Sequence, residues 1–278
     1  MREDILETAA TDGYRLRYRS WQGGASDTLV VLQHGVLTHS AWFGELGDAL
    51  LERGIHALGH DRRGSGLNLE ERGDIDGPQR LLDDLHSLVE PQRPRYARII
   101  HLGWCLGATV ALRYLLERPA MGEGLILMSP DIFERHLSAS VRRIFSDPQW
   151  DDRVLPRLKV PIPVEIYTDT PYLDSFIRPD PLKLYDFTPR LLRASLRLKA
   201  NLKEDFQAFR KPSLLVLAGR DRIIDNDRTR ELYGQIGSPS PRVLVLDTNH
   251  GIQFEALAAL AEAVADFATG RAVREEAA

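Results

Sequence analysis

A short apolar strand, a turn flanked by glycines and a helix follow one another in the middle of the chain. Ile99–Leu102 has the composition of a buried strand, the turn is Gly103-Trp104-Cys105-Leu106-Gly107, and apolar residues then recur at helical spacing up to Leu115. This G-x-C-x-G order is typical of a nucleophile elbow, a strained turn that projects its central side chain from the edge of a sheet. The flanking glycines leave room for that close approach. The segment therefore predicts an α/β sheet with Cys105 exposed to a cleft.

Cys105 allows two interpretations. The helix that begins directly after it directs free N–H groups and the positive end of its dipole toward the sulfur, which favours a thiolate nucleophile. The alternative is a buried, small apolar residue, as most free cysteines are. The turn alone does not distinguish them, so the rest of the chain has to decide.

Composition narrows the class of protein. With 278 residues, 43% apolar and 27% charged, the chain fits a soluble globular protein of one large or two small domains. A net charge of −4 without a basic cluster argues against nucleic-acid binding. The single cysteine excludes an internal disulfide, and the residue pattern leads us to expect neither a signal peptide nor a membrane-spanning run. We therefore expect a cytoplasmic protein, and the scattered histidines predict neither a metal site nor a cofactor.

Strands and helices alternate along most of the chain. Asp12-Gly13 predicts an antiparallel hairpin at the start, and the later apolar runs predict a mostly parallel central sheet flanked by helices. The predicted strands are Leu6–Thr8, Arg15–Trp21, Thr28–Gln33, Ile55–Gly59, Ile99–Leu102, Gly124–Met128, a run from Ser213, and Arg242–Leu246. The predicted helices are Ala41–Arg53, Pro78–Glu90, the helix after the elbow, Asp227–Gly234 and Ile252–Ala268.

The alternation is interrupted after Pro130. Residues 134–211 contain helical segments punctuated by prolines, and we interpret them as a helical cap inserted into a core formed by residues 1–133 and 212–278. Aromatic residues of the cap either pack a small core or contact an apolar substrate: Phe145, Trp150, Tyr167, Tyr172, Phe176, Tyr185 and Phe187.

Three residues that can form a catalytic triad each follow a predicted strand. These residues are Cys105, Asp221 and His250, and the active site of a parallel α/β sheet lies at the carboxyl ends of its strands. Asp225 is the alternative acid. We prefer Asp221 because it follows the glycine immediately after its strand, whereas Asp225 fits the N-cap of the next helix. The joint placement of the three residues favours the nucleophile interpretation of Cys105.

With these residues, the chain resembles the α/β-hydrolase superfamily, and most closely its monoacylglycerol-lipase and lysophospholipase-like branch. The motifs that carry the resemblance are His34-Gly35, His39-Ser40, Asp61-Arg-Arg-Gly-Ser-Gly66, the elbow, Ala218-Gly-Arg-Asp-Arg-Ile-Ile-Asp225 and Asn249-His-Gly251. The resemblance implies an inserted cap, the order nucleophile, acid, histidine, and an oxyanion hole formed by the backbone N–H groups of Val36 and Leu106.

The neighbouring residues receive supporting roles. We expect Leu37 and Trp104, which flank the nucleophile, to line the acyl pocket. His34 shapes the oxyanion loop rather than acting as a base, and Asp61 and Arg62 brace neighbouring loops.

The cysteine departs from this branch, which uses serine. A thiolate is a better leaving group than an alkoxide, so a tetrahedral intermediate on cysteine returns to substrate when the substrate is an ordinary alkyl ester. Activated esters, lactones and thioesters avoid this problem, and cysteine-using relatives such as dienelactone hydrolases fit the pattern. The sequence therefore predicts a thioester acyl-enzyme formed by a Cys-His-Asp triad and its hydrolysis. An engineered replacement of a native serine would give the same sequence.

Two further functions stay open. An acyltransferase or cyclising enzyme would pass the acyl group from a thioester to an amine, an alcohol or a thiol, and a catalytically silent protein would only bind a small molecule. The expected partner is a small-molecule acyl substrate, with a coenzyme A or carrier-protein thioester as one candidate. Cationic residues of the cap either contact such a substrate's phosphates or form a solvated face: Arg135, Arg142, Arg143, Arg153 and Arg157. The oligomeric state is not predicted.

Overall fold

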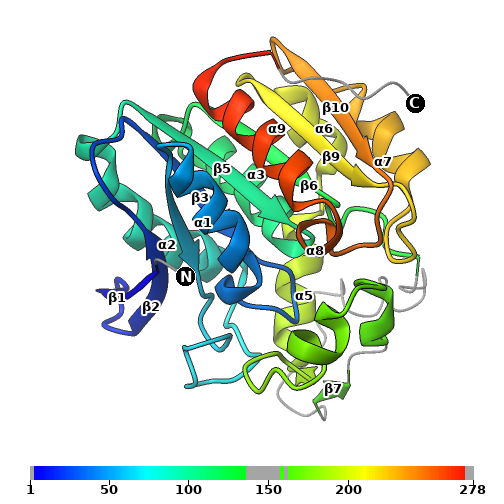
Figure 1. Cartoon of the computed structure of the whole chain (residues 1–278). Helices are drawn as coiled ribbons and strands as arrows, with labels where there is room; N and C mark the ends of the chain where they lie inside the picture. Colours follow the sequence, from blue (N-terminus) through cyan, green and yellow to red (C-terminus); the bar gives the residue numbers. More distant parts are fainter. Residues whose placement is uncertain (1–2, 136–156, 160–161, 273–278) are drawn as a thin grey trace.

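A computed structural model describes residues 3–135, 157–159 and 162–272 (Figure 1). Several residues of the predicted cap lie outside the described residues, namely Arg142, Arg143, Phe145, Trp150 and Arg153. Residues 273–278 also lie outside them.

An eight-stranded sheet forms the centre of the molecule and confirms the predicted fold class. Its strand order is β1-β2-β4-β3-β5-β6-β9-β10, with β1, β2 and β4 paired antiparallel and every other pair parallel. The central strands are buried on both faces, as their continuous apolar runs require. The strands are β1 (Asp4–Ala9), β2 (Arg15–Trp21), β3 (Thr28–Gln33), β4 (His56–His60), β5 (Arg98–Trp104), β6 (Gly124–Met128), β9 (Ser213–Ala218) and β10 (Pro241–Leu246).

Helices cover both faces of the sheet (Figure 1). Helices α1 (Gly44–Glu52) and α9 (Leu257–Thr269) pack against each other on one face. The opposite face carries α2 (Pro78–Val89), α3 (Leu106–Glu117) and α6 (Leu202–Ala208), and α6 packs against α7 (Asn226–Tyr233). Shorter helical segments are η1 (Ser40–Phe43), η2 (Glu90–Arg95), η3 (Pro119–Met121) and α8 (Ile252–Glu255). Among the described helices, none has the length and apolar composition to cross a membrane.

Two predicted helices differ from those observed. The helix predicted over Ala41–Arg53 begins as the 3₁₀ turn η1, whose N-cap is the His39 side chain, and becomes α-helical only at Gly44. The helix predicted over Ile252–Ala268 is divided into α8 and α9 at Ala256, whose φ of −133° is not helical. The Glu255 carboxylate accepts the N–H groups of Asn249 (2.9 Å) and Asp169 (3.1 Å), which fixes α8 to two loops.

The segment predicted as a cap connects β6 and β9, which are neighbours in the sheet. Its described parts lie at the carboxyl ends of the strands in Figure 1, except α6, which packs against α3 and α7. The boundaries of the cap, residues 134–211, stay a prediction. The described elements of this segment besides α6 are β7 (Leu158–Lys159), η4 (Val164–Ile166), η5 (Leu173–Ile177), β8 (Asp186–Phe187) and α5 (Pro189–Leu198).

Candidate active site

The elbow holds Cys105 in a backbone conformation that few side chains adopt. Cys105 lies between β5 and α3 with φ 54° and ψ −120°. A side chain at Gly103 would collide with the backbone of Gly107 and Ala108, and one at Gly107 would collide with the Gln33 carbonyl. Both glycines are therefore required by close backbone approach, and the strained turn places Cys105 at the first turn of α3.

His250 and Asp221 form a buried pair at the same edge of the sheet. Nδ1 of His250 donates to Oδ2 of Asp221 at 2.8 Å, and both side chains are fully buried. The other carboxylate oxygen, Oδ1 of Asp221, accepts the N–H groups of Ile223 (2.8 Å) and Ile224 (3.0 Å). These contacts fix the carboxylate and therefore the orientation of the imidazole.

Nε2 of His250 is the ring nitrogen that the contact with Asp221 leaves unused. Nε2 is buried and makes no well-formed hydrogen bond. Cys105 nevertheless interacts with the imidazole and raises the pKa of His250. Contacts between a catalytic base and its nucleophile are often loose without substrate. The structure thus brings Cys105, His250 and Asp221 together, whereas Asp225 caps α7 by accepting the N–H of Arg228 at 3.2 Å.

The pair sets the charge of the imidazole. Burial disfavours protonation of His250, but the Asp221 carboxylate, its hydrogen bond and Cys105 outweigh burial and raise the pKa of His250 to about 10. Burial likewise opposes the charge on Asp221, and the interaction with His250 nevertheless lowers the pKa of Asp221. His250 therefore carries a proton at neutral pH.

The pH dependence of stability tests this pair. Because the pKa of folded His250 is raised, its stabilising interaction is fully present below about pH 6.5 and is lost as the pH rises through about 10. We expect Asp221→Asn to reduce the free energy of unfolding more at pH 6.5 than at pH 10, as measured by denaturant titration. The control Asp225→Asn keeps an equally good helix cap and is expected to change little at either pH. An equal loss at both pH values for Asp221→Asn would contradict the charge assignment.

The loop after β3 approaches Cys105. A Cβ at Gly35 would lie 3.3 Å from the Cβ of Cys105, so this loop passes directly beside the elbow. Arg62 donates to three consecutive carbonyls of the loop, those of His34 (2.5 Å), Gly35 (2.8 Å) and Val36 (3.1 Å). The Val36 N–H and the Gly35 carbonyl belong to the same trans peptide and point in opposite directions. Because Arg62 binds the Gly35 carbonyl, the Val36 N–H points away from Arg62.

His34 has the structural part expected for it. Its Nε2 accepts the backbone N–H of Arg62 at 3.1 Å, and its Nδ1 donates to the Gly35 carbonyl at 2.8 Å. Burial and the nearby Arg62 lower the pKa of His34 well below its ordinary value, so the ring is neutral. His34 therefore connects the loop after β3 to the loop after β4.

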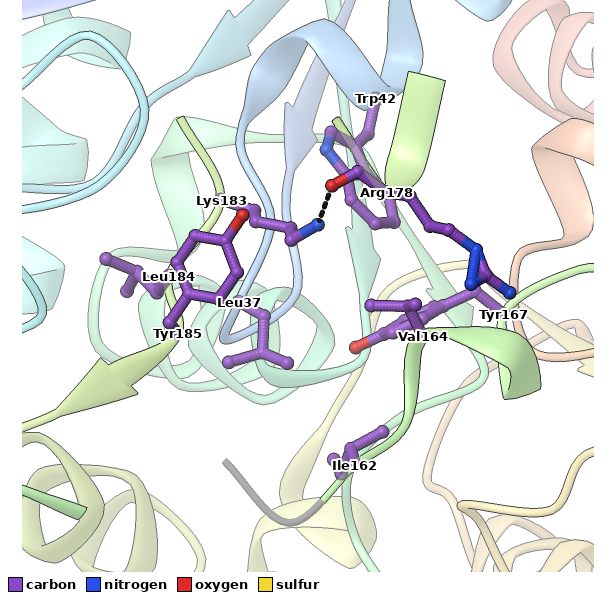
Figure 2. A pocket seen from close by; sticks show the side chains of 9 residues that line it. All are labelled: Leu37, Trp42, Ile162, Val164, Tyr167, Arg178, Lys183, Leu184 and Tyr185. Atoms are coloured by element: carbon purple, nitrogen blue, oxygen red, sulfur yellow. Dashed lines mark hydrogen bonds between the residues drawn. The ribbon is translucent and has the colours of Figure 1, made fainter. Parts of the chain in front are cut away.

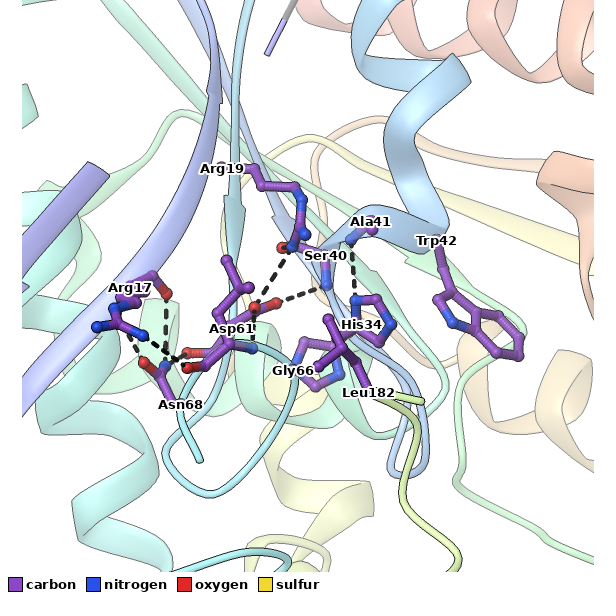
Figure 3. A network of polar contacts seen from close by, with 12 residues as sticks. Arg17, Arg19, His34, Ser40, Ala41, Trp42, Asp61, Gly66, Asn68 and Leu182 are labelled. Atoms are coloured by element: carbon purple, nitrogen blue, oxygen red, sulfur yellow. Dashed lines mark hydrogen bonds and ion pairs between the residues drawn. The ribbon is translucent and has the colours of Figure 1, made fainter. Parts of the chain in front are cut away.

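A second polar network supports the loop after β4 (Figure 3). The buried Asp61 carboxylate accepts the backbone N–H groups of Ser40 (2.6 Å) and Leu67 (2.9 Å), and Arg19 lies 3.5 Å from it. The Asn68 side chain donates to the Asp61 carbonyl at 2.8 Å. The network holds the loops after β3 and β4 together, as predicted for Asp61.

A cavity of about 360 Å³ adjoins these loops (Figure 2). Leu37 is one of its lining residues, as expected, and Tyr167 of the predicted cap is another. Trp104 is not among them; it is fully buried, and its indole N–H donates to the His250 carbonyl at 3.1 Å. Its ring packs against those of Trp42 and Tyr167, which do line the cavity. The lining residues are Leu37, Trp42, Ile162, Val164, Tyr167, Arg178, Lys183, Leu184 and Tyr185.

Sequence reasoning missed part of this pocket. Trp42 lies inside the helix predicted over Ala41–Arg53, so the sequence does not assign it to the pocket. Its position shortly after His39-Ser40 is the sequence feature that could have indicated this role. Tyr167 stood among the cap aromatics, but its carbonyl also accepts the N–H of Gly251 at 2.7 Å, beside His250. Lys183 follows a segment without periodicity, and nothing in the sequence indicated it.

Comparison with known proteins identifies the family. Residues 24–256 match the family model Hydrolase_4, described as serine aminopeptidase, S33. Rat monoglyceride lipase is 27% identical over 147 residues, which cover 52% of this chain and 48% of that enzyme. The mouse monoglyceride lipase is 24% identical over 239 residues, covering 81% and 75%. The crystal structure of Paleococcus ferrophilus monoacylglycerol lipase superposes with a TM-score of 0.80 at 18% identity, covering 92% of this chain and 99% of that one, a likeness of fold.

Fold and family match together define a hydrolase of the α/β-hydrolase type, similar to monoglyceride lipases. The chain belongs to the serine aminopeptidase S33 family, Hydrolase_4. The chain spans about half the length of the rat enzyme in their alignment, so its own substrate is a separate question.

Proposed function

We propose that this hydrolase uses Cys105 as its nucleophile and cleaves activated esters, lactones or thioesters through a thioester acyl-enzyme. The observation that carries the proposal is the position of Cys105 on a strained elbow, beside a buried histidine whose Nδ1 donates to Asp221 at 2.8 Å. The raised pKa of His250 agrees with a thiolate–imidazolium pair. The family description names a serine enzyme, and cysteine occupies the elbow of this chain.

The mechanism begins from a thiolate and the protonated His250. Sγ of Cys105 attacks the acyl carbonyl, and the backbone N–H groups of Val36 and Leu106 stabilise the resulting oxyanion. His250 gives its proton to the leaving group as the bond to the acyl carbon breaks. It then removes a proton from water, which attacks the thioester and regenerates the thiolate.

The leaving group restricts the substrate class. When the tetrahedral intermediate collapses, a cysteine thiolate leaves more readily than an alkyl alkoxide, so ordinary alkyl esters mostly return to substrate. A thiolate, an enolate or an aryl oxide competes well. A coenzyme A or carrier-protein thioester belongs to this class, but Arg157, one candidate cation for its phosphates, is paired with Asp186 at 2.6 Å, as in the alternative of a solvated face.

Intact-protein mass spectrometry tests the proposal. The protein is mixed with a panel of acyl thioesters and activated aryl esters, with and without an added amine. Because the chain has one cysteine, an adduct localises to it by comparison with the Cys105→Ala variant. An adduct that disappears in water supports a hydrolase, and one that persists until an amine, alcohol or thiol is added means an acyltransferase. No adduct with any compound would refute the nucleophile and favour a binding protein.

A further inference from the structure

Lys183 is a buried cation in the wall of the pocket. Lys183 is 6% exposed, and its Nζ donates to the carbonyls of Ile177 (2.6 Å) and Arg178 (2.7 Å). Figure 2 shows the second of these hydrogen bonds. Nζ also lies 5.0 Å from the centroid of the Tyr185 ring. An ammonium has three N–H donors, and these contacts with neutral groups use two of them.

The surrounding carboxylates of the described chain have other partners. Asp180, three residues before Lys183, accepts from Trp42 Nε1 (2.7 Å), His39 Nε2 (3.0 Å) and the Leu182 N–H (2.9 Å). Within the described ranges no carboxylate forms an ion pair with Lys183. A buried charge without a counter-charge is costly, and a bound anion would remove that cost.

The other cation of the pocket is already neutralised. Arg178 is about half exposed and forms ion pairs with Glu165 (2.9 Å) and Asp174 (2.8 Å). Among the described lining residues, Lys183 is therefore the cation that is available to an anionic ligand. The rest of the wall is mostly apolar, with Leu37 connecting it to the oxyanion loop.

We propose that Lys183 binds a carboxylate carried at the end of an apolar acyl chain, so that the enzyme prefers half-esters or half-thioesters of dicarboxylic acids. This inference rests on the proposed function, because it names the acyl group that Cys105 receives. The apolar wall contacts the methylene chain, and the third N–H of Lys183 donates to the terminal carboxylate. Leu184 fixes the segment in place, since its N–H donates to the Leu37 carbonyl at 2.7 Å.

Two matched substrates test the inference. The 4-nitrophenyl thioesters of octanoic acid and of octanedioic acid share chain length and leaving group, and differ in a terminal methyl or carboxylate. We expect kcat/KM to be at least tenfold higher for the dicarboxylic substrate. In Lys183→Met, a neutral side chain of similar length, this ratio is expected to fall at least tenfold. Lys159→Met, which removes an exposed cation of β7, serves as the control and should keep the ratio.

The outcomes separate the two proposals. Equal kcat/KM values for the two thioesters in the wild-type protein overturn the dicarboxylic preference and leave the cysteine hydrolase standing, and this reading needs no variant. A preference that survives in Lys183→Met as in Lys159→Met overturns the assignment to Lys183. If neither thioester acylates Cys105, both proposals fail.

Discussion

Cys105→Ala is expected to lower kcat/KM on an acyl thioester by about 10³-fold or more, because no other group in the mechanism can form the acyl-enzyme. Turnover is followed by release of the free thiol. Iodoacetamide labelling adds an independent readout, since the chain has a single cysteine. We expect one label on the wild-type protein and none on Cys105→Ala.

Cys105→Ser separates the identity of the nucleophile from its position. Serine forms an ester intermediate, whose alkoxide has no advantage over an alkyl leaving group, so the variant should shift preference toward oxygen esters. The ratio of kcat/KM for an ethyl ester to that for the matching ethyl thioester is expected to rise at least tenfold. Full activity in Cys105→Ala, or an unchanged ratio in Cys105→Ser, would contradict the nucleophile assignment.

Local sterics made the elbow predictable from sequence. Gly103 and Gly107 flank Cys105 at positions where a side chain would meet backbone, and such constraints are visible in a few consecutive residues. The choice between Asp221 and Asp225 was also local: the first follows the glycine after β9, and the second begins a helix. Alternating apolar runs placed the ends of the strands, and therefore the candidate triad, at one edge of the sheet.

Contacts between distant parts of the chain were not predictable in this way. Ala256 is a good helix former, yet α8 and α9 separate there, next to Glu255, whose carboxylate binds the Asn249 loop just before α8 and the distant loop at Asp169. Trp104 was expected in the pocket because it neighbours Cys105, whereas its indole turns inward to the carbonyl of His250. The position of Lys183 in the pocket wall depends on the folded structure, and no pattern in the sequence indicates it.

Arg62→Met is expected to lower kcat by about 10² to 10³-fold, the range associated with losing an oxyanion-hole donor. Arg62 is 4% exposed and donates to three consecutive carbonyls of the loop after β3. In the proposed mechanism this loop supplies the Val36 N–H to the oxyanion, so losing these contacts would displace that donor. Burial lowers the pKa of Arg62 to about 10, which still leaves it charged at neutral pH. A lysine presents a compact ammonium instead of a planar fork, so Arg62→Lys should not restore kcat.

Arg63→Met is the matched control for this prediction. Arg63 is the next residue and is also buried, but its guanidinium pairs with Asp84 (3.0 Å) and Asp12 (2.9 Å), away from the oxyanion loop. Removing it leaves Asp84 buried without a partner and is expected to cost about 3–5 kcal/mol of stability. We therefore expect Arg63→Met to lower the denaturation midpoint with kcat largely kept, and Arg62→Met to lower kcat in protein that remains folded. If kcat in folded Arg62→Met equals that of Arg63→Met, the carbonyl contacts of Arg62 serve stability and not the oxyanion loop.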